Sequence, residues 1–315
     1  MVEELKECPL GDDGALADTL KQLQPKKGQG GYLHAVCGVY PAKRLVRRAT
    51  IEPRRVKEAG YLNDTAATQF RIEPDKYTLA MVTATEGLDY DVSKTPGKEV
   101  VFCGLPTEDI AVLQESILAK GIYPTRLELG TVATVGALAD YLNFSKSKTP
   151  TLVLELGMNS THSFIVSTGG LDASRPIPQG LDSMIPVVQK ELGLKDEESA
   201  RKLFFSNTFD FTGMGPALIK KLLKELQSSI GFYEVQTGQS IGQVMCTHLP
   251  PKLGWLENSI AGQLGVGVLK LDLVSWLQAR QITLSDEASA TPFDGRWLGL
   301  FSLMAQYHAA VSDKK

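Results

Sequence analysis

Short apolar runs and helical periodicities alternate along most of the chain. Near its middle, apolar runs at 152–154 and 164–166 flank a turn that is rich in glycine and hydroxyl side chains. Gly169 and Gly170 then form a second turn before another extended segment. Short apolar runs bounded by Gly and Asn are typical of strands joined as hairpins. The segment 151–180 therefore predicts two paired strands followed by a third.

Helical spacing of apolar residues appears on both sides of this segment. Leu218, Leu222 and Leu226 lie on one side of a predicted amphipathic helix, and charged residues occupy its other side. Thr107 is expected to cap another helix that Gly121 ends. The remaining expected helices cover 13–23, 53–67, 134–142, 183–192, 197–203, 256–264 and 297–307. The remaining expected strands cover 32–40, 48–51, 76–85, 99–105, 127–129, 241–246 and 266–271. This alternation favours an α/β layer fold.

The length of 315 residues suggests two domains. The polar segment 145–150 (SKSKTP) is the expected hinge between a first lobe, 1–148, and a second lobe, 149–315. A block of strands with one helix, at about 32–105, is expected to form a small inserted α+β subdomain. In the second lobe, a helical insertion is expected at about 195–238.

Charge and composition narrow the classes of function. The chain has 33 basic and 36 acidic residues, a balance that argues against a nucleic-acid binder. No apolar run approaches the length of a membrane span and no signal peptide opens the chain, so we expect a cytoplasmic protein.

One basic cluster has two open interpretations: a solvated strand edge, or a contact to acidic lipid or a partner protein. The cluster comprises Lys43, Arg44, Arg47, Arg48, Arg54, Arg55 and Lys57.

Candidate chemistry is concentrated in the turn of the central hairpin. Gly157, Asn159, Ser160 and Thr161 can present backbone N–H groups and side-chain oxygens to a phosphate, or can simply form a hairpin turn. The cysteines and histidines show no zinc-ligand spacing. The sequence also offers no nucleophile–base arrangement for covalent catalysis.

Several phrases, taken in order, resemble the PilM proteins of type IV pilus machines. The phrases are VLQESILAKGIYPTRLELGTVATVGAL, LVLELGMNSTHSFIV, RPIPQGLDSMIPVVQKELGLKDEESARKL, LLKELQSSIGFYEVQ and DGRWLGLFSLMAQY. PilM proteins are relatives of the cell-division protein FtsA within the actin-like ATPase superfamily. The resemblance implies an actin-like (ribonuclease H-like) two-lobed α/β fold with a small inserted α+β subdomain.

The same resemblance implies a nucleotide site. Gly157, Asn159, Ser160 and Thr161 stand at the family's second phosphate loop. Glu155 replaces its usual aspartate as the metal-binding carboxylate. Lys224 and Glu225 would flank an adenosine pocket.

Two further departures weaken this implied site. The family's first phosphate loop has no counterpart here, and CTHLPP, 246–251, replaces its Gly-Gly adenosine loop. The residues themselves indicate no cofactor, and Mg-ATP is the cofactor that the resemblance suggests. We expect a degenerate nucleotide site without hydrolysis.

The implied role is a scaffold at the cytoplasmic face of the inner membrane. It would hold the cytoplasmic tail of a PilN-like bitopic membrane protein in a groove of the first lobe. Two alternatives stay open: an active ATP-dependent phosphotransferase or ATPase of the superfamily, and a GspL-like component of type II secretion. The missing leading strands would leave an open sheet edge. We expect a second copy of the chain, a rearranged segment or the helix 13–23 to cover that edge.

Overall fold

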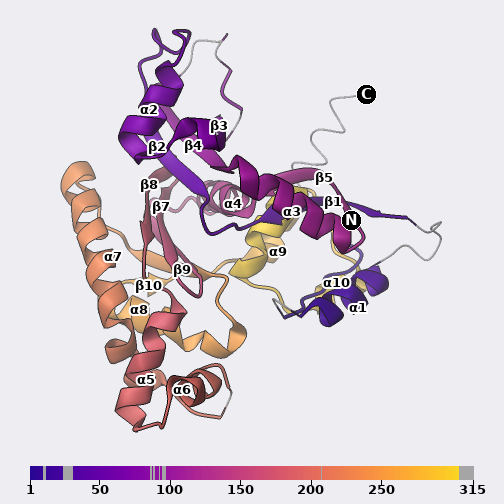
Figure 1. The fold of residues 1–315 in the computed structure, drawn as a ribbon, viewed down its shortest axis with the longest axis vertical. Coiled ribbons are helices and arrows are strands. Elements are labelled where there is room, and N and C mark those ends of the chain that lie inside the picture. Colours follow the sequence, from indigo (N-terminus) through magenta and orange to yellow (C-terminus); the bar gives the residue numbers. More distant parts are fainter. Residues whose placement is uncertain are drawn as a thin grey trace.

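A five-stranded sheet forms the centre of the molecule in the computed structural model (Figure 1). The structure describes residues 1–304 except 10–11, 24–30, 86, 88, 92, 94–96 and 207. The strand order is β8-β7-β6-β9-β10; β6, β7 and β8 are antiparallel neighbours, whereas β9 is parallel to β6 and β10 to β9. This is the ribonuclease H-like order expected from the resemblance. The strands are β6 (Thr151–Leu156), β7 (Thr161–Ser167), β8 (Gly170–Ile177), β9 (Gln243–Thr247) and β10 (Gly267–Val268).

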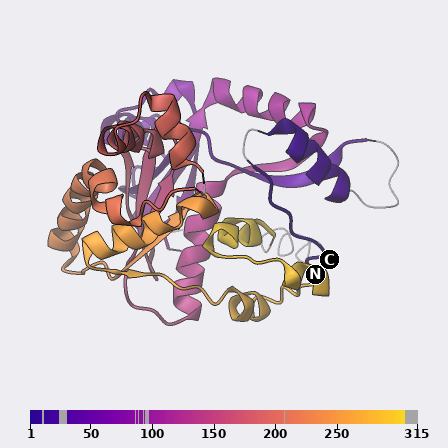
Figure 2. The ribbon, with the colours of Figure 1, turned by 90° about the horizontal axis from the view of Figure 1, so that it is seen from below.

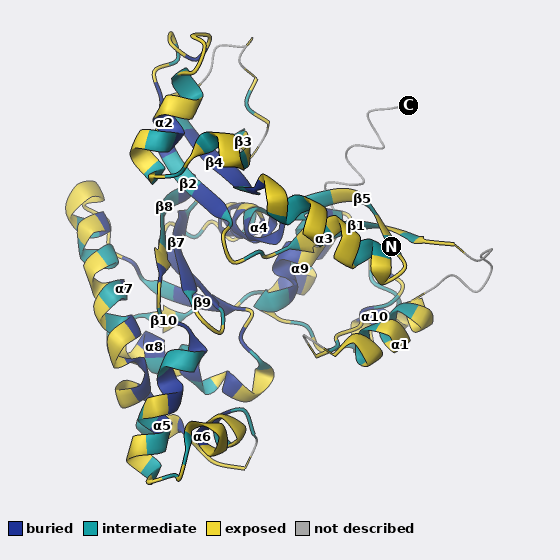
Figure 3. Ribbon diagram, in the orientation of Figure 1, coloured by how far each residue is buried: buried dark blue, intermediate teal, exposed yellow. Residues whose placement is uncertain are grey.

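Helices cover both faces of this sheet, which explains why every residue of β6 is buried. Leu152 and Leu154 point into a core shared with one set of helices, and Val153 points into the core on the other face. Figure 3 shows α4 as an almost wholly buried helix. The first face carries α5 (Ile185–Leu192), α6 (Glu197–Phe204), α7 (Gly215–Thr237) and α8 (Trp255–Leu264). The second carries α4 (Gly130–Phe144), α9 (Leu273–Ala279), α10 (Asp286–Ala290) and the helical residues 298–304.

A three-stranded antiparallel sheet forms a separate unit at the top of Figure 1. Its order is β2-β4-β3, and it packs with α2 around Ala66 and Phe102. The expected insert, at about 32–105, starts in β1, but β1 pairs with β5 in another sheet, so the three-stranded unit begins at β2. Its elements are β2 (Leu45–Thr50), α2 (Tyr61–Phe70), β3 (Tyr77–Thr83) and β4 (Glu99–Pro106).

A two-stranded parallel sheet of β1 and β5 lies beside this unit. Of its residues only Leu129 is buried. The helix α3 follows β4 and packs on β5, while α1 has no buried residue. The elements are α1 (Asp13–Leu23), β1 (Leu33–Val39), α3 (Thr107–Ala119) and β5 (Ile122–Leu129).

Several boundaries differ from the expected ones. Thr107 is the first residue of α3 and caps nothing with its side chain. The helix expected at 53–67 begins only at Tyr61, because 53–60 form turns that end in Gly60 at φ +82°. The strand expected at 266–271 shortens to two residues, and α9 and α10 were not expected. The closing helix expected at 297–307 is helical at 298–304, and its last three residues lie outside the described part.

The N-terminal segment runs along the C-terminal part of the chain (Figure 2). Val2 forms a parallel bridge with Leu284, and its N–H donates to the carbonyl of Thr283 at 2.7 Å. Val2 and Leu5 are buried in the core on the α4 side of the sheet. Within the described residues, no helix is long and apolar enough to cross a membrane.

Candidate functional site: a buried carboxylate beside the central sheet

The site is centred on Glu155, a carboxylate near the end of β6. It is 2% exposed and lies on the same face of the sheet as Val153, toward α4. Its register partners are His162 on β7 and Thr247 on β9, both buried. Strand alternation therefore gathers three polar side chains in one row across the sheet.

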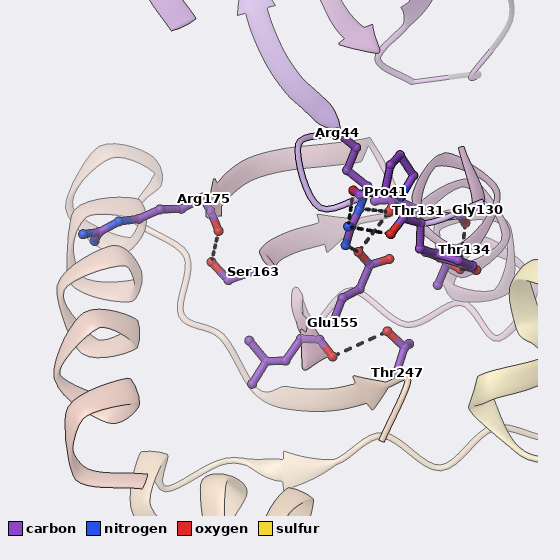
Figure 4. A network of polar contacts seen from close by, with 11 residues as sticks. Pro41, Arg44, Gly130, Thr131, Thr134, Glu155, Ser163, Arg175 and Thr247 are labelled. Carbon is purple, nitrogen blue, oxygen red and sulfur yellow. Dashed lines mark hydrogen bonds and ion pairs between the residues drawn. The ribbon is translucent and has the colours of Figure 1, made fainter. Parts of the chain in front are cut away.

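Arg44 and Thr131 satisfy one oxygen of this carboxylate (Figure 4). Arg44, in the loop between β1 and β2, donates from Nη2 to Glu155 Oε2 and forms a buried ion pair with it. Thr131, in the first turn of α4, donates from Oγ1 to the same oxygen at 2.9 Å. Its Oγ1 also accepts from Arg44 Nε at 2.7 Å. The three side chains thus form a closed triangle of polar contacts.

Aromatic side chains form the rim of the site. The rings of Tyr40 and His248 lie with centroids 4.0 Å apart and are nearly perpendicular. The hydroxyl of Tyr40 lies 3.4 Å from Thr134 Oγ1. His248 has φ +62°, a left-handed conformation that is unfavourable for a residue with a Cβ. We call Tyr40, Arg44, Thr131, Glu155, His162 and His248 the Glu155 cluster.

Burial sets the protonation of this cluster. It raises the pKa of Glu155, while the charge and hydrogen bonds of Arg44 and Thr131 oppose that rise. Burial, with Arg44 as the next cause, lowers the pKa of His162 to about 4 and that of His248 to about 4. His248 is exposed, so solvent screens the charge interactions that lower its pKa more than it screens those of His162. Both imidazoles are therefore neutral at pH 7.

The residues expected to form a phosphate loop make a hairpin turn whose polar groups are largely used internally. The N–H of Gly157 donates to the carbonyl of Ser160 at 3.0 Å. The hydroxyl of Thr161 donates to the carbonyl of Gln179 at 2.7 Å. Asn159 is exposed. The turn follows Glu155 closely, but these polar groups are bonded within the turn or to the segment after β8.

The segment after β8 packs closely against this turn. The carbonyls of Gly157 and Met158 accept hydrogen bonds from the N–H groups of Leu181 and Asp182, at 3.0 and 2.9 Å. A Cβ at Gly180 would lie 2.3 Å from the carbonyl oxygen of Met158. Glycine is therefore required at 180 for space.

Lys224 and Glu225 lie over the other face of the sheet. Glu225 accepts from Arg175 Nη2 at 2.6 Å, and Lys224 is exposed on α7. Arg175 pairs in register with Ser163, and Ser163 pairs in register with Leu154, so these three side chains lie on one face of the sheet. The side chain of Arg175 therefore points away from Glu155, which lies on the other face (Figure 4). The structure does not bring this pair together with Glu155.

The arrangement does not fit Mg-ATP. Glu155 Oε2 already accepts from Arg44 and Thr131, and Oε1 is buried without a hydrogen-bond partner in the described structure. A divalent cation at that oxygen would lie beside the Arg44 guanidinium and needs several oxygen ligands. His248, Pro250 and Pro251 follow β9, in the segment where the resemblance implies close approach of the backbone to a nucleotide.

Most members of the cluster were not expected from the sequence. Glu155 was, and His248 lay in the CTHLPP segment that departs from the family, but Tyr40, Thr131 and His162 carried no local signal. Arg44 stood out only as one of the basic residues at 43–57. A contact between residues 111 positions apart has no signature in a single sequence.

No protein-family model and no curated protein sequence matches this chain. Its fold is similar to a chain in the solved structure of a PilM-PilN type IV pilus biogenesis complex. That match has 17% identity and a TM-score of 0.65, covering 95% of this chain and 87% of that one. EutJ, an ethanolamine utilization protein from Carboxydothermus hydrogenoformans, matches with 12% identity and a TM-score of 0.38 over 63% of this chain and 61% of its own. The archaeal actin homologue Ta0583 matches with 13% identity and a TM-score of 0.35 over 59% and 57%. The chain has the actin-like fold, and its likeness to PilM is confirmed at the level of the fold.

Proposed function

We propose that this protein is a non-catalytic scaffold of a type IV pilus inner-membrane platform. It would lie on the cytoplasmic face of that membrane and hold the cytoplasmic tail of a PilN-like membrane protein. Its fold likeness to a chain from a PilM-PilN complex, over nearly the whole length of both chains, supports this assignment. The two lobes, 1–148 and 149–315, would act as a rigid support rather than as a nucleotide clamp.

The observation that carries the non-catalytic part is the engagement of Glu155 by the chain's own Arg44. In a nucleotide site, a carboxylate at this position would face a metal-bound water, whereas here it faces a guanidinium. Thr131 donates a second hydrogen bond to the same oxygen, Glu155 Oε2. The internally bonded turn at 157–161 and the distant Lys224 and Glu225 support the same conclusion.

The two-stranded sheet of β1 and β5 supports the binding of an extended peptide. In the described structure β1 pairs with β5 alone, so its other edge presents unpaired N–H and carbonyl groups. Tyr32 and Tyr123, which are 55% and 47% exposed, lie near this sheet. An added strand at such an edge gains main-chain hydrogen bonds, and pockets beside it select side chains.

Calorimetric titration with Mg-ATP, followed by a phosphate-release assay, tests the non-catalytic part. We expect no heat of binding for the natural chain. The variant R44S/E155D removes the guanidinium and introduces the shorter carboxylate; binding by this variant, and not by the natural chain, would identify the Arg44–Glu155 pair as the block. Turnover by the natural chain would contradict the proposal and favour the phosphotransferase or ATPase alternative.

A second titration tests the partner. A synthetic peptide with the cytoplasmic tail sequence of a PilN-like protein encoded next to this gene should bind, and a scrambled peptide should not. Leu33 and Ala35 turn their backbone hydrogen-bonding groups toward β5, so those of His34 and Val36 face the open edge of β1. A proline at His34 or Val36 would place a ring at that edge and should weaken binding if the tail adds as a strand. Normal binding by both proline variants, with their fold intact, would exclude β1 as the docking edge.

A further inference from the structure

A basic pocket lies between the three-stranded unit and the edge of the central sheet. Its volume is about 280 Å³. One wall comes from β2, the end of α2 and the start of β3, and the other from β7 and β8. None of the lining residues is Asp or Glu. We call it the Arg47 pocket; its lining includes Lys43, Arg47, Phe70, Tyr77, Phe164 and Arg175.

The basic cluster of the sequence divides into paired and unpaired cations in the structure. Arg44 pairs with Glu155, and Arg48 pairs with Glu99 and Asp172, each at 2.9 Å. Arg47 differs, because its one hydrogen bond goes from Nη1 to the carbonyl of Ser174 at 2.5 Å. No carboxylate of the described chain forms an ion pair with it. Arg47 therefore lines the pocket without a carboxylate partner, whereas Arg44 lines it as the partner of Glu155.

The environment of Arg47 favours an added negative charge. The side chain is half-buried, and burial together with the nearby charge of Arg175 lowers its pKa. Arg175 is itself paired with Glu225, but Lys43 at the pocket mouth is exposed. A guanidinium held partly out of water has donors that a carboxylate or phosphate matches with two parallel hydrogen bonds.

Apolar side chains complete the lining. The rings of Phe70, Tyr77 and Phe164 lie around the basic groups. A bare inorganic ion would leave these rings uncovered, whereas an acidic side chain next to an apolar one would use both parts of the pocket. The pocket volume is just below the usual range for small-molecule sites, which suits one or two side chains of a peptide.

We propose that the Arg47 pocket binds an acidic peptide segment, in which a carboxylate side chain meets Arg47 and Lys43 and a neighbouring apolar side chain packs on the rings. Because the two walls come from different sheets, a bound segment would tie the three-stranded unit to β8. This proposal does not depend on the scaffold role, and the pocket is separate from the open edge of β1.

Calorimetry of the full chain with two capped tripeptides tests the proposal. The first is acetyl-Leu-Glu-Leu-amide, the second replaces its glutamate with glutamine, and inorganic phosphate is the third probe. We expect the glutamate peptide to bind at least about tenfold more tightly than the glutamine peptide, because charge-assisted hydrogen bonds are the stronger kind. Arg47→Gln should lose about that tenfold preference.

Two further variants keep the test interpretable. Arg54→Gln removes one exposed charge from the same unit outside the pocket and should leave the affinity within about twofold. Lys43→Gln changes an exposed residue that carries no risk to the fold, and it should weaken the glutamate peptide if Arg47→Gln fails to fold.

Three results would overturn the proposal. The glutamate and glutamine peptides could bind equally. Arg54→Gln could lower the affinity as much as the pocket variants do, which would indicate a general charge effect. Phosphate could bind in an Arg47-dependent way while neither peptide binds, which would assign the pocket to a free anion.

Discussion

Arg44 and Glu155 form an ion pair whose side chains are 8% and 1% exposed, so both charges are almost completely removed from water. The pair joins the loop between β1 and β2 to the centre of the five-stranded sheet. Thr131 adds α4 to the same contact. One small group of side chains therefore fixes three parts of the fold relative to one another.

Removing one partner of this pair should be costly. Arg44→Met leaves Glu155 buried without its counter-charge, and we expect a loss of about 3–5 kcal/mol in the free energy of unfolding. R44M/E155L removes both charges and should be less destabilised than R44M alone. Urea unfolding of the natural chain, R44M, E155L and R44M/E155L gives a double-mutant cycle. Additive losses would show that the two side chains are not coupled.

Thr131→Val keeps the shape of the side chain but removes the hydroxyl that bridges Arg44 and Glu155. We expect a loss of about 1–3 kcal/mol, since two buried polar groups each lose a partner. Thr65→Val is the matched control, because Thr65 is also buried and its hydroxyl donates within its own helix, α2, to the carbonyl of Tyr61. Thermal unfolding should show a clearly larger loss at 131 than at 65. Equal losses would mean that the bridge contributes no stability beyond that of an ordinary helical threonine.

Acid should destabilise the protein through His162. Its pKa is lowered from 6.5 to about 4 in the folded state, so the unfolded chain binds the proton more readily. The stability that the neutral ring contributes is complete above pH 6.5 and is lost as the pH falls toward 4; the loss is on the order of 3 kcal/mol. Unfolding free energies measured from pH 7.5 to 4.5 should fall less steeply for His162→Gln.

Two glycine substitutions should have opposite effects. Gly136 lies exposed within α4 with open space around it, so Gly136→Ala should stabilise the protein by about 0.5–1 kcal/mol. Gly180→Ala would place a Cβ against the carbonyls of Gly157 and Met158 and should cost about 1–3 kcal/mol. Melting temperatures of the two variants compare the effects directly. A neutral Gly180→Ala would show that the turn after Glu155 can shift.

Local patterns in the sequence predicted much of the fold. The hairpins of β6, β7 and β8 follow from short apolar runs and glycine turns, and α7 follows from the spacing of Leu218, Leu222 and Leu226. Gly121, at φ +78°, ends α3 as expected. By contrast, α9 and α10 have seven and five residues, too few for a helical period to stand out.

The candidate site was less accessible to prediction. Glu155 could be found because the resemblance placed it where the family's second phosphate loop carries its aspartate. Its partner could not, because the choice of Arg44 over Arg47 or Arg48 depends on how the three-stranded unit packs against the sheet. The position of Lys224 and Glu225 likewise depends on which face of the sheet α7 covers.

The pairing of Val2 with Leu284 has a consequence for how the chain is made. At about 5–20 residues per second, a ribosome needs on the order of tens of seconds to travel from one residue to the other. During that interval Val2 and Leu5 have no place to be buried, since the segment that receives Val2 does not yet exist. Folding of this half of the molecule is therefore completed only after Leu284 has been synthesised, and such long-range closure is intrinsically slow.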